Sequence, residues 1–189
     1  KVGEEGVTLL KNNGVLPLAK NSEVTPFGYR FVSPVWGGAG SAATNMNYDY
    51  VVTPKEALQM NYKLNTEVVS ALEAARPAEL KSSAEGFKDD ASTVMTIFEF
   101  DPAVYEGKQA SCQGTVGVVF IGRLGLEGDD MWAKPYDGGQ ADHSLQLTKH
   151  EKGMIQFAKT NCDKVVVICN FSNRMEIGAL AEDNDIDAI

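Results

Sequence analysis

Apolar residues form two nearly continuous runs in the second half of the chain, at residues 115–121 and 164–170. Such runs are typical of strands that are buried on both faces of a parallel sheet. Between them, the sequence Thr-Lys-His-Glu at 148–151 is a capping box, which predicts the start of a helix. A further helix over 175–181 and a strand starting at 186 continue the alternation. Strands and helices that alternate in this way predict a parallel sheet with right-handed crossovers.

The first half of the chain carries a less regular pattern. The apolar spacing predicts a helix over residues 2–12, a short strand near 24–31 and a helix over 64–75. A second capping box, with proline at the first helical position, predicts that another helix starts within 53–56. Residues 76–90 are polar and show no apolar period, so we expect a surface excursion there.

These elements together predict an α/β fold, a three-layer αβα sandwich with a mostly parallel sheet. The sheet is expected to be incomplete at the C-terminus, because no helix follows the strand that starts at residue 186. The length suits a single domain over residues 1–189, large enough to bury a core. The 43% of hydrophobic and 23% of charged residues are ordinary for a globular protein.

Composition excludes several classes of partner. The net charge is −9 and no block of Lys or Arg is present, so we expect no binding to nucleic acid. No apolar run approaches the ~18 residues of a membrane helix, so we expect no membrane partner. The three cysteines form neither a CxxC pair nor a disulfide pattern and are interpreted as unpaired structural thiols. His143 and His150 are interpreted as ordinary surface histidines. The compartment is left open, leaning towards the cytoplasm.

A glycine-rich loop at residues 37–43 follows the first predicted strand. Its residues Gly38, Gly40 and Ser41 carry little side-chain bulk, and ligands of parallel sheets gather at the carboxyl ends of strands. The loop also matches the dinucleotide fingerprint GxGxxA, but that fingerprint needs a strand directly before the glycines and a helix directly after them. Trp36 and its neighbours intervene, and no helix is predicted until the second capping box. A ligand loop, a plain surface turn and a nucleotide site are all compatible with the pattern.

A second candidate loop follows the most apolar predicted strand. It contains Arg123, Trp132 and three carboxylates, which are Glu127, Asp129 and Asp130. One interpretation is a solvated acidic turn, and another is a site for a hard cation such as magnesium. The third is a catalytic acid, because a carboxyl group at a strand end with apolar neighbours has a raised pKa.

Four segments match a known pattern of residues in the same order. Residues 4–18 resemble EGxxLLKNxxxxLPL, with three residues instead of four before LPL. Residues 37–45 follow GGxGSxxxN, and Gly122-Arg123 with Glu127-Gly128-Asp129 resembles GRxxxEGxD. Residues 145–170 continue the pattern. The chain therefore resembles the C-terminal domain of family 3 glycoside hydrolases, the β-glucosidase family. The resemblance covers roughly two-thirds of the chain and is weak over 62–110.

This resemblance implies a chemistry and residue roles. Enzymes of this family combine a barrel domain, which holds an aspartate nucleophile, with an α/β sandwich that closes over the sugar. In many members the glutamate of the EG pair is the general acid/base, and it corresponds to Glu127. The chain departs from the pattern at Leu126, where a small residue is usual. It departs again at Asp130, where an arginine often follows the aspartate.

The sequence thus predicts a domain of a retaining β-glycosidase, by preference a β-glucosidase, that uses no cofactor and no metal. Its expected partners are a β-glucoside or oligosaccharide and the barrel domain, without which we expect no turnover. Trp36, Arg123 and Trp132 are expected to line the sugar or to position Glu127, at the same sheet edge as the glycine loop. The alternative for these residues is ordinary packing and a structural ion pair. The alternative is a non-catalytic α/β module that binds a nucleotide or a sugar.

Overall fold

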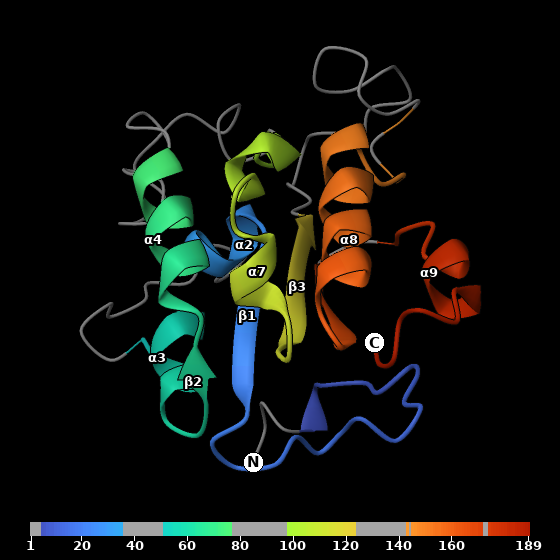
Figure 1. Cartoon of the computed structure of the whole chain (residues 1–189). Helices are drawn as coiled ribbons and strands as arrows, with labels where there is room; N and C mark the ends of the chain where they lie inside the picture. The colour runs from blue at the N-terminus through green and yellow to red at the C-terminus, as the bar shows by residue number, and fades with distance from the viewer. Residues whose placement is uncertain (1–4, 36–50, 77–97, 124–142, 144, 172–173) are drawn as a thin grey trace.

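The computed structural model of the protein describes residues 5–35, 51–76, 98–123, 143, 145–171 and 174–189. Within these ranges one parallel sheet has the strand order β2-β1-β3-β4 (Figure 1). Its strands are β1 (Glu23–Phe27), β2 (Lys63–Leu64), β3 (Val116–Arg123) and β4 (Lys164–Phe171). The helices are α2 (Tyr29–Val32), α3 (Pro54–Gln59), α4 (Thr66–Ala75), the 3-10 helix η4 (Pro102–Tyr105), α7 (Gln109–Cys112), α8 (Lys149–Asn161) and α9 (Gly178–Glu182).

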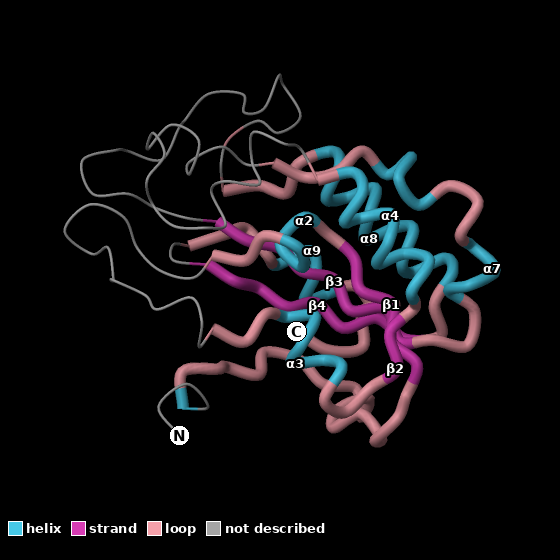
Figure 2. The backbone as a smooth tube through the Cα atoms, turned by 90° about the vertical axis from the view of Figure 1, so that its left-hand side faces the viewer, coloured by secondary structure: helices cyan, strands magenta, loops and turns pink. Residues whose placement is uncertain are grey.

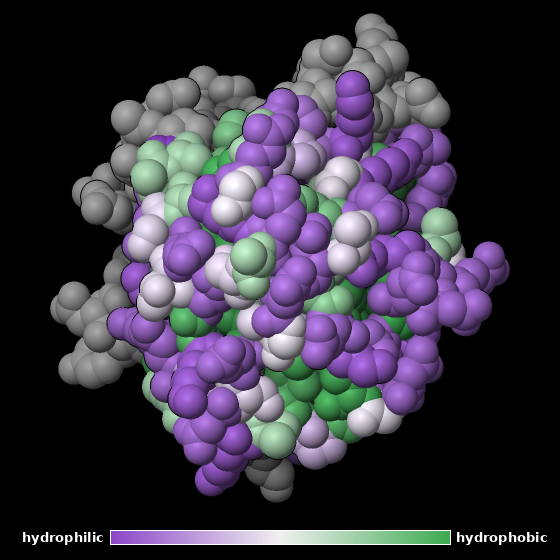
Figure 3. All heavy atoms as spheres, viewed as in Figure 1, coloured by the Kyte–Doolittle hydropathy of each residue, from purple (hydrophilic) through white to green (hydrophobic). Residues whose placement is uncertain are grey.

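Helices lie on both sides of the sheet. Figure 2 shows α4, α7 and α8 on one side and α3 on the other. Hydrophilic side chains dominate the outer surface of the α4–α8 side (Figure 3). Beneath them, fully buried residues of the strands and helices form the core, among them Phe27, Val119, Ile121, Leu72 and Met154. This layered arrangement confirms the α/β fold predicted from the sequence.

Both predicted capping boxes are present. The Thr53 hydroxyl accepts from the Glu56 N–H at 3.2 Å, and the Glu56 carboxylate accepts from the Thr53 N–H at 2.8 Å. Thr148 and Glu151 form the same reciprocal pair at the start of α8, with bonds of 3.1 and 2.8 Å. Each pair satisfies donors that a helix N-terminus leaves free, which is why these helices begin where the local sequence predicts. Strands β3 and β4 also match the predicted runs.

The predicted helix over residues 2–12 is wrong. Residues 7–11 are not helical, and Asn12 forms an isolated antiparallel bridge with Ala188. The N–H groups of Leu10 and Lys11 both donate to the carbonyl of Ile189, at 2.8 and 3.2 Å, and the Ile189 N–H donates to Lys11. Pairing with a segment from the far end of the chain therefore replaces the local helical bonds.

The remaining predictions need smaller corrections. The strand predicted near 24–31 ends at Phe27, because Gly28 turns the chain into α2. The last predicted helix is shorter than expected and forms α9. Ala188 pairs in parallel with Val166 of β4, so an isolated bridge stands where a strand starting at 186 was expected. The surface excursion at 76–90 falls almost wholly outside the described residues.

Among the described residues, no helix has the length and hydropathy needed to cross a bilayer.

Gly28 provides a test of the turn that ends β1. Its φ of +101° is a conformation that side chains rarely adopt, and an added Cβ would lie 2.5 Å from the Phe120 carbonyl oxygen. We expect Gly28→Ala to lower the free energy of unfolding by roughly 3 kcal/mol or more, since backbone strain and a clash with the neighbouring strand add together. Gly14→Ala is the control, because Gly14 has a φ of +89° but open space around it. Urea denaturation that gives equal losses for the two variants would contradict this account of the turn.

Candidate active site at the carboxyl edge of the sheet

The strands that precede the two candidate loops end at the same edge of the sheet. Strands β1 and β3 are parallel neighbours, with Phe27 opposite Val119, and Arg123 at the end of β3 lies opposite Phe171. The shared position of the loops themselves stays a prediction, because most of their residues lie outside the described ranges. Those residues are Trp36, Gly38, Gly40, Ser41, Glu127 and Trp132.

Arg123, the last residue of β3, is held by a buried ion pair with Glu151 of α8. The two terminal nitrogens of Arg123 lie 2.5 and 2.7 Å from the two carboxylate oxygens of Glu151. Both side chains are at most 3% exposed. Arg123 also donates to the carbonyls of Gly122 and Gln146, at 3.0 and 2.9 Å. Such a two-bond pair fixes direction as well as distance.

This geometry defines the role open to Arg123. The sequence leaves three roles open to Arg123: lining the sugar, positioning Glu127, or forming a structural ion pair. Its guanidinium is buried, and both terminal nitrogens are already bonded to protein oxygens. The arrangement therefore favours a positioning role. Arg123 anchors the end of β3, directly before the acidic loop, and does not present its bonded nitrogens to a ligand.

Arg30 of α2 lies across the end of β3. A Cβ added to Gly122 would lie 2.8 Å from Arg30 Cγ and 3.0 Å from its Nε, so only glycine leaves room for this side chain. The guanidinium carbon lies 5.4 Å from the centre of the Tyr29 ring, within range of a cation–π interaction. Arg30 Nη1 donates to the Ser33 carbonyl at 3.3 Å, while its Nε is buried and has no hydrogen-bond partner within the described ranges. Loss of solvation lowers the pKa of Arg30.

Glu99 places a second buried carboxyl group near Arg30. It is 3% exposed, and its Oε1 accepts from the N–H groups of Tyr29 and Phe100 at 2.9 and 2.8 Å. Burial, followed by the nearby charge of Glu151, raises its pKa to about 8. Arg30 and the two backbone N–H groups act in the opposite direction but do not offset the burial. Glu99 is therefore protonated and neutral at pH 7.

The start of the glycine loop is bonded to the end of β4. The Val35 N–H donates to the side-chain oxygen of Asn170 at 3.0 Å. Val35 directly precedes Trp36, and Asn170 is the penultimate residue of β4. The chain therefore enters the glycine loop from a fixed point at the carboxyl edge.

The two histidines take part in local contacts. His150 Nδ1 lies 3.2 Å from the Glu99 carbonyl, and His143 Nδ1 accepts from the Leu145 N–H at 3.2 Å. Their side chains are 22% and 30% exposed, so neither is as open as the sequence suggested. Within the described ranges, His, Cys, Asp and Glu side chains form no cluster of three or more that could hold a metal.

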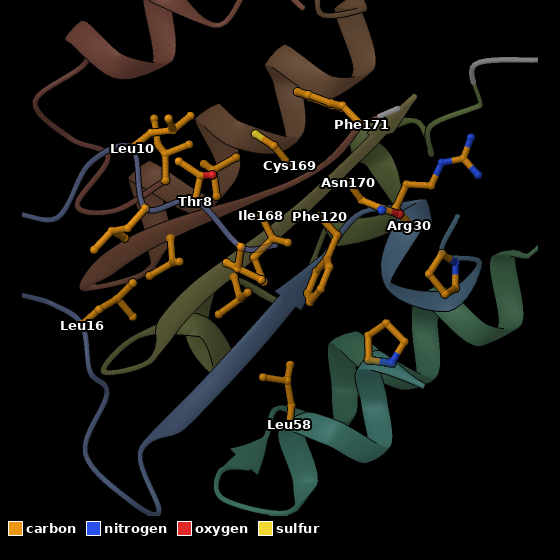
Figure 4. Close-up of a pocket in the computed structure, with 18 of the residues that line it drawn as sticks. Thr8, Leu10, Leu16, Arg30, Leu58, Phe120, Ile168, Cys169, Asn170 and Phe171 are labelled. Atoms are coloured by element: carbon orange, nitrogen blue, oxygen red, sulfur yellow. The ribbon is translucent and has the colours of Figure 1, made fainter. Parts of the chain in front are cut away.

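An apolar hollow lies on the α3 side of the sheet and reaches the carboxyl edge at Arg30 and Asn170. It has a volume of about 840 Å³, and Figure 4 shows Phe120 of β3, Ile168 of β4, Leu58 of α3 and Leu10 of the N-terminal segment around it. Sugars are bound through many hydroxyl groups and need hydrogen-bond donors and acceptors, of which this lining supplies few. We therefore assign no glycoside chemistry to the hollow.

No sequence motif indicated Arg30 or Glu99 as members of the edge. Arg30 fell inside a predicted strand, and Glu99 fell in a segment to which no role was assigned. The one available signal for Glu99 was its place between two aromatic residues, Phe98 and Phe100, since a charged residue in apolar surroundings is usually paired. Glu151 was recognised as a helix cap, but its second role as the partner of Arg123 joins residues distant in sequence.

Parallel α/β domains with a site at the carboxyl edge occur in many protein families. The family of this chain is therefore assigned by similarity to known proteins. The profile of the family described as "Glycosyl hydrolase family 3 C-terminal domain" matches residues 7–189. The chain belongs to this family, as the sequence resemblance predicted.

Individual relatives agree with this assignment. The chain is 28% identical over 183 residues to a β-glucosidase of Ruminococcus albus, covering 96% of the chain and 18% of the relative. It is 24% identical over 208 residues to β-glucosidase A of Butyrivibrio fibrisolvens, covering 98% of the chain and 23% of the relative. The chain thus spans about a fifth of the length of these proteins.

Solved structures share the fold. A β-glucosidase from Paenibacillus barengoltzii superposes with a TM-score of 0.70 at 24% identity, covering 95% of this chain and 19% of that one. β-Glucosidase 3B from Thermotoga neapolitana, solved in complex with α-D-glucose, gives a TM-score of 0.70 at 23% identity, with coverage of 99% and 25%.

The importance of the Arg123–Glu151 pair can be measured by removing one charge. We expect Arg123→Met to lower the free energy of unfolding by about 3–5 kcal/mol, because Glu151 is left buried without its counter-ion. Adding Glu151→Gln should recover part of this loss, since the amide is uncharged and its oxygen still accepts from the Thr148 N–H. Lys164→Met is the control: Lys164 pairs with Asp187 but is 55% exposed, so its loss should cost under about 1 kcal/mol. Similar denaturant midpoints for Arg123→Met and Lys164→Met would show that the buried pair has no special weight.

Glu99 should make stability depend on pH. Its pKa is raised from 4.5 to about 8, so the folded protein keeps a proton that the unfolded chain loses above pH 4.5. Stability therefore falls as pH rises through this window, by on the order of 4 kcal/mol in total, and is level above it. Glu99→Gln, which cannot ionise, should unfold at the same midpoint as the wild type near pH 4.5 and at a higher one at pH 8. If both proteins show the same slope of stability between pH 5 and 8, the buried carboxyl group is already ionised.

Proposed function

We propose that the chain covers the active site of a retaining β-glycosidase and supplies the general acid/base for hydrolysis of terminal β-glucosyl residues. Membership of the glycosyl hydrolase family 3 C-terminal domain supports this function. The observation that carries it is the buried Arg123–Glu151 pair, which holds the end of β3 directly before the acidic loop. A catalytic carboxyl group needs a loop that starts from a fixed position, because small misplacements of the group reduce the reaction rate strongly.

Glu127 is the proposed acid/base. Four peptide units separate it from Arg123, so its Cα lies within about 14 Å of that anchored residue. Aromatic faces and small residues suit a sugar ring with one apolar face. We therefore keep Trp36, Trp132, Gly38, Gly40 and Ser41 as proposed sugar contacts, while Arg123 acts as a positioning residue.

A second carboxyl group must come from elsewhere in the protein. Retaining hydrolysis needs a nucleophile about 5–5.5 Å from the acid/base. The matched relatives are about five times as long as this chain and are β-glucosidases. We propose that an aspartate nucleophile lies in a companion barrel domain, and that the isolated chain releases no sugar from a β-glucoside. The reaction as proposed requires no cofactor.

The alternative of a nucleotide-binding module gains no support from the fold. Strand β1 ends at Phe27, eleven residues before Gly38, and the helix that follows it directly is the four-residue α2. The dinucleotide fingerprint requires its glycines at that junction, where the phosphates meet the helix N-terminus. The glycine loop therefore does not fit the dinucleotide fingerprint. It is better suited to contact another ligand from the longer segment that follows α2.

Replacing Glu127 in the protein that contains both domains tests the function. A general acid protonates the departing oxygen, so Glu127→Ala should slow cellobiose cleavage by ~10²–10⁴-fold. An aryl glucoside with a good leaving group needs no such proton, and its glycosyl-enzyme should still form. Azide, which attacks without deprotonation, should then restore turnover and yield a β-glycosyl azide. Steady-state kinetics on both substrates, with and without azide, measure these effects.

The neighbouring carboxylates are matched controls. Asp129→Ala and Asp130→Ala remove the same charge from the same loop, but neither should show rescue by azide. Wild-type activity of Glu127→Ala on cellobiose would show that another residue is the acid/base.

A further inference from the structure

Two of the three cysteines lie side by side at the amino end of the sheet. Cys112 is the last residue of α7, and Cys162 is the C-cap of α8. Their side chains interact with each other, although they are far apart in sequence. Their spacing alone predicts unpaired structural thiols, since no spacing motif joins the three cysteines. The fold, not the spacing, brings these two together.

The surroundings hold this pair in place. The Thr115 hydroxyl lies 2.7 Å from the Cys112 carbonyl and 3.7 Å from Cys162 Sγ, so it bridges the two residues. On β3, a Cβ added to Gly117 would lie 3.0 Å from Cys162 Sγ, so glycine makes the space that this sulfur occupies. Cys112 is fully buried, and Cys162 is half-buried and gives the pair its access to solvent.

We propose that Cys112 and Cys162 form an oxidation site, at which hydrogen peroxide converts the two thiols into a reversible disulfide. One thiolate attacks a peroxide oxygen, the O–O bond breaks, and hydroxide leaves a sulfenic acid on that sulfur. The second sulfur attacks the first, the S–S bond forms, and the second oxygen leaves as water after taking up a proton. The two sulfurs together lose two electrons, and one peroxide becomes two waters.

Each thiol changes the ionisation of the other. Their interaction lowers the pKa of Cys112 and raises that of Cys162. Because the Thr115 hydroxyl contacts both residues, rotations of the two cysteine side chains are sufficient to bring the sulfurs to the length of a disulfide.

Cys169 provides an internal comparison. It lies near the carboxyl end of β4, whereas Cys162 directly precedes the amino end of the same strand. Burial raises the pKa of Cys169 to about 11, so it has little thiolate at neutral pH. It has neither a neighbouring sulfur within the described residues nor the reactivity to compete with the pair.

The bond would close the unit that carries the acidic loop. Cys112 stands just before β3 and Cys162 just before β4, so the disulfide would enclose β3, the loop after it and α8. This inference goes beyond the proposed glycosidase function and does not depend on it.

Differential alkylation of the intact protein tests the site. Native protein is treated with hydrogen peroxide and denatured in a light alkylating reagent. It is then reduced and labelled with the heavy form of the reagent, and its peptides are analysed by mass spectrometry. We expect Cys112 and Cys162 to take the heavy label together, a non-reduced sample to show their peptides crosslinked, and Cys169 to stay light. The oxidised protein should also unfold roughly 5–10 °C higher, and a dithiol reductant should reverse the shift.

Single variants serve as controls. Cys169→Ser should leave the crosslink unchanged, whereas Cys112→Ser and Cys162→Ser should each abolish it without creating a bond to Cys169. Two results would overturn the proposal: light labelling of both Cys112 and Cys162 after oxidation, or a crosslink that includes Cys169. Both can be read from the wild-type protein, so they do not depend on the folding of any variant.

Discussion

The buried ion pair between Arg123 and Glu151 is the constraint on which the carboxyl edge depends. The Glu151 carboxylate serves two elements at once, since it caps the first turn of α8 and neutralises the arginine that ends β3. Removing two charges from water is costly and is offset only when nearly all of their hydrogen bonds are made. That requirement allows one relative position of β3 and α8, and it sets the point from which the acidic loop departs.

A second layer of the same edge follows from this pairing. The Glu151 carboxylate, which pairs with Arg123, disfavours a second negative charge nearby. It therefore contributes to the raised pKa of Glu99. With Glu99 neutral, the four-residue group of Arg30, Arg123, Glu99 and Glu151 carries one net positive charge at pH 7. Arg30 bears that charge next to the end of β3, on the side from which both candidate loops leave. A cation there favours the ionised form of carboxyl groups that approach it.

Local sequence signals predicted the fold well wherever the deciding interactions are local. The capping boxes at Thr53 and Thr148 and the apolar runs of β3 and β4 describe contacts within one element, and each was confirmed. The helix predicted over residues 2–12 failed because its backbone groups pair with Ile189, at the other end of the chain. No periodicity in the first twelve residues carries information about that partner.

The same distinction explains what could be learned about the site. The sequence identified Gly122 and Arg123 through a motif but could not decide between a role near the sugar and a structural ion pair for the arginine, because a motif reports which residues recur and not where they point. In the fold, Gly122 is small so that Arg30 can cross the strand, and Arg123 turns inward to Glu151. Both residues of the motif thus serve the architecture. The role proposed for Glu127 requires that the acidic loop start from a fixed position and carry one carboxyl group. That position is set by Arg123, so departures from the family pattern at Leu126 and Asp130 leave the anchor of the loop unchanged.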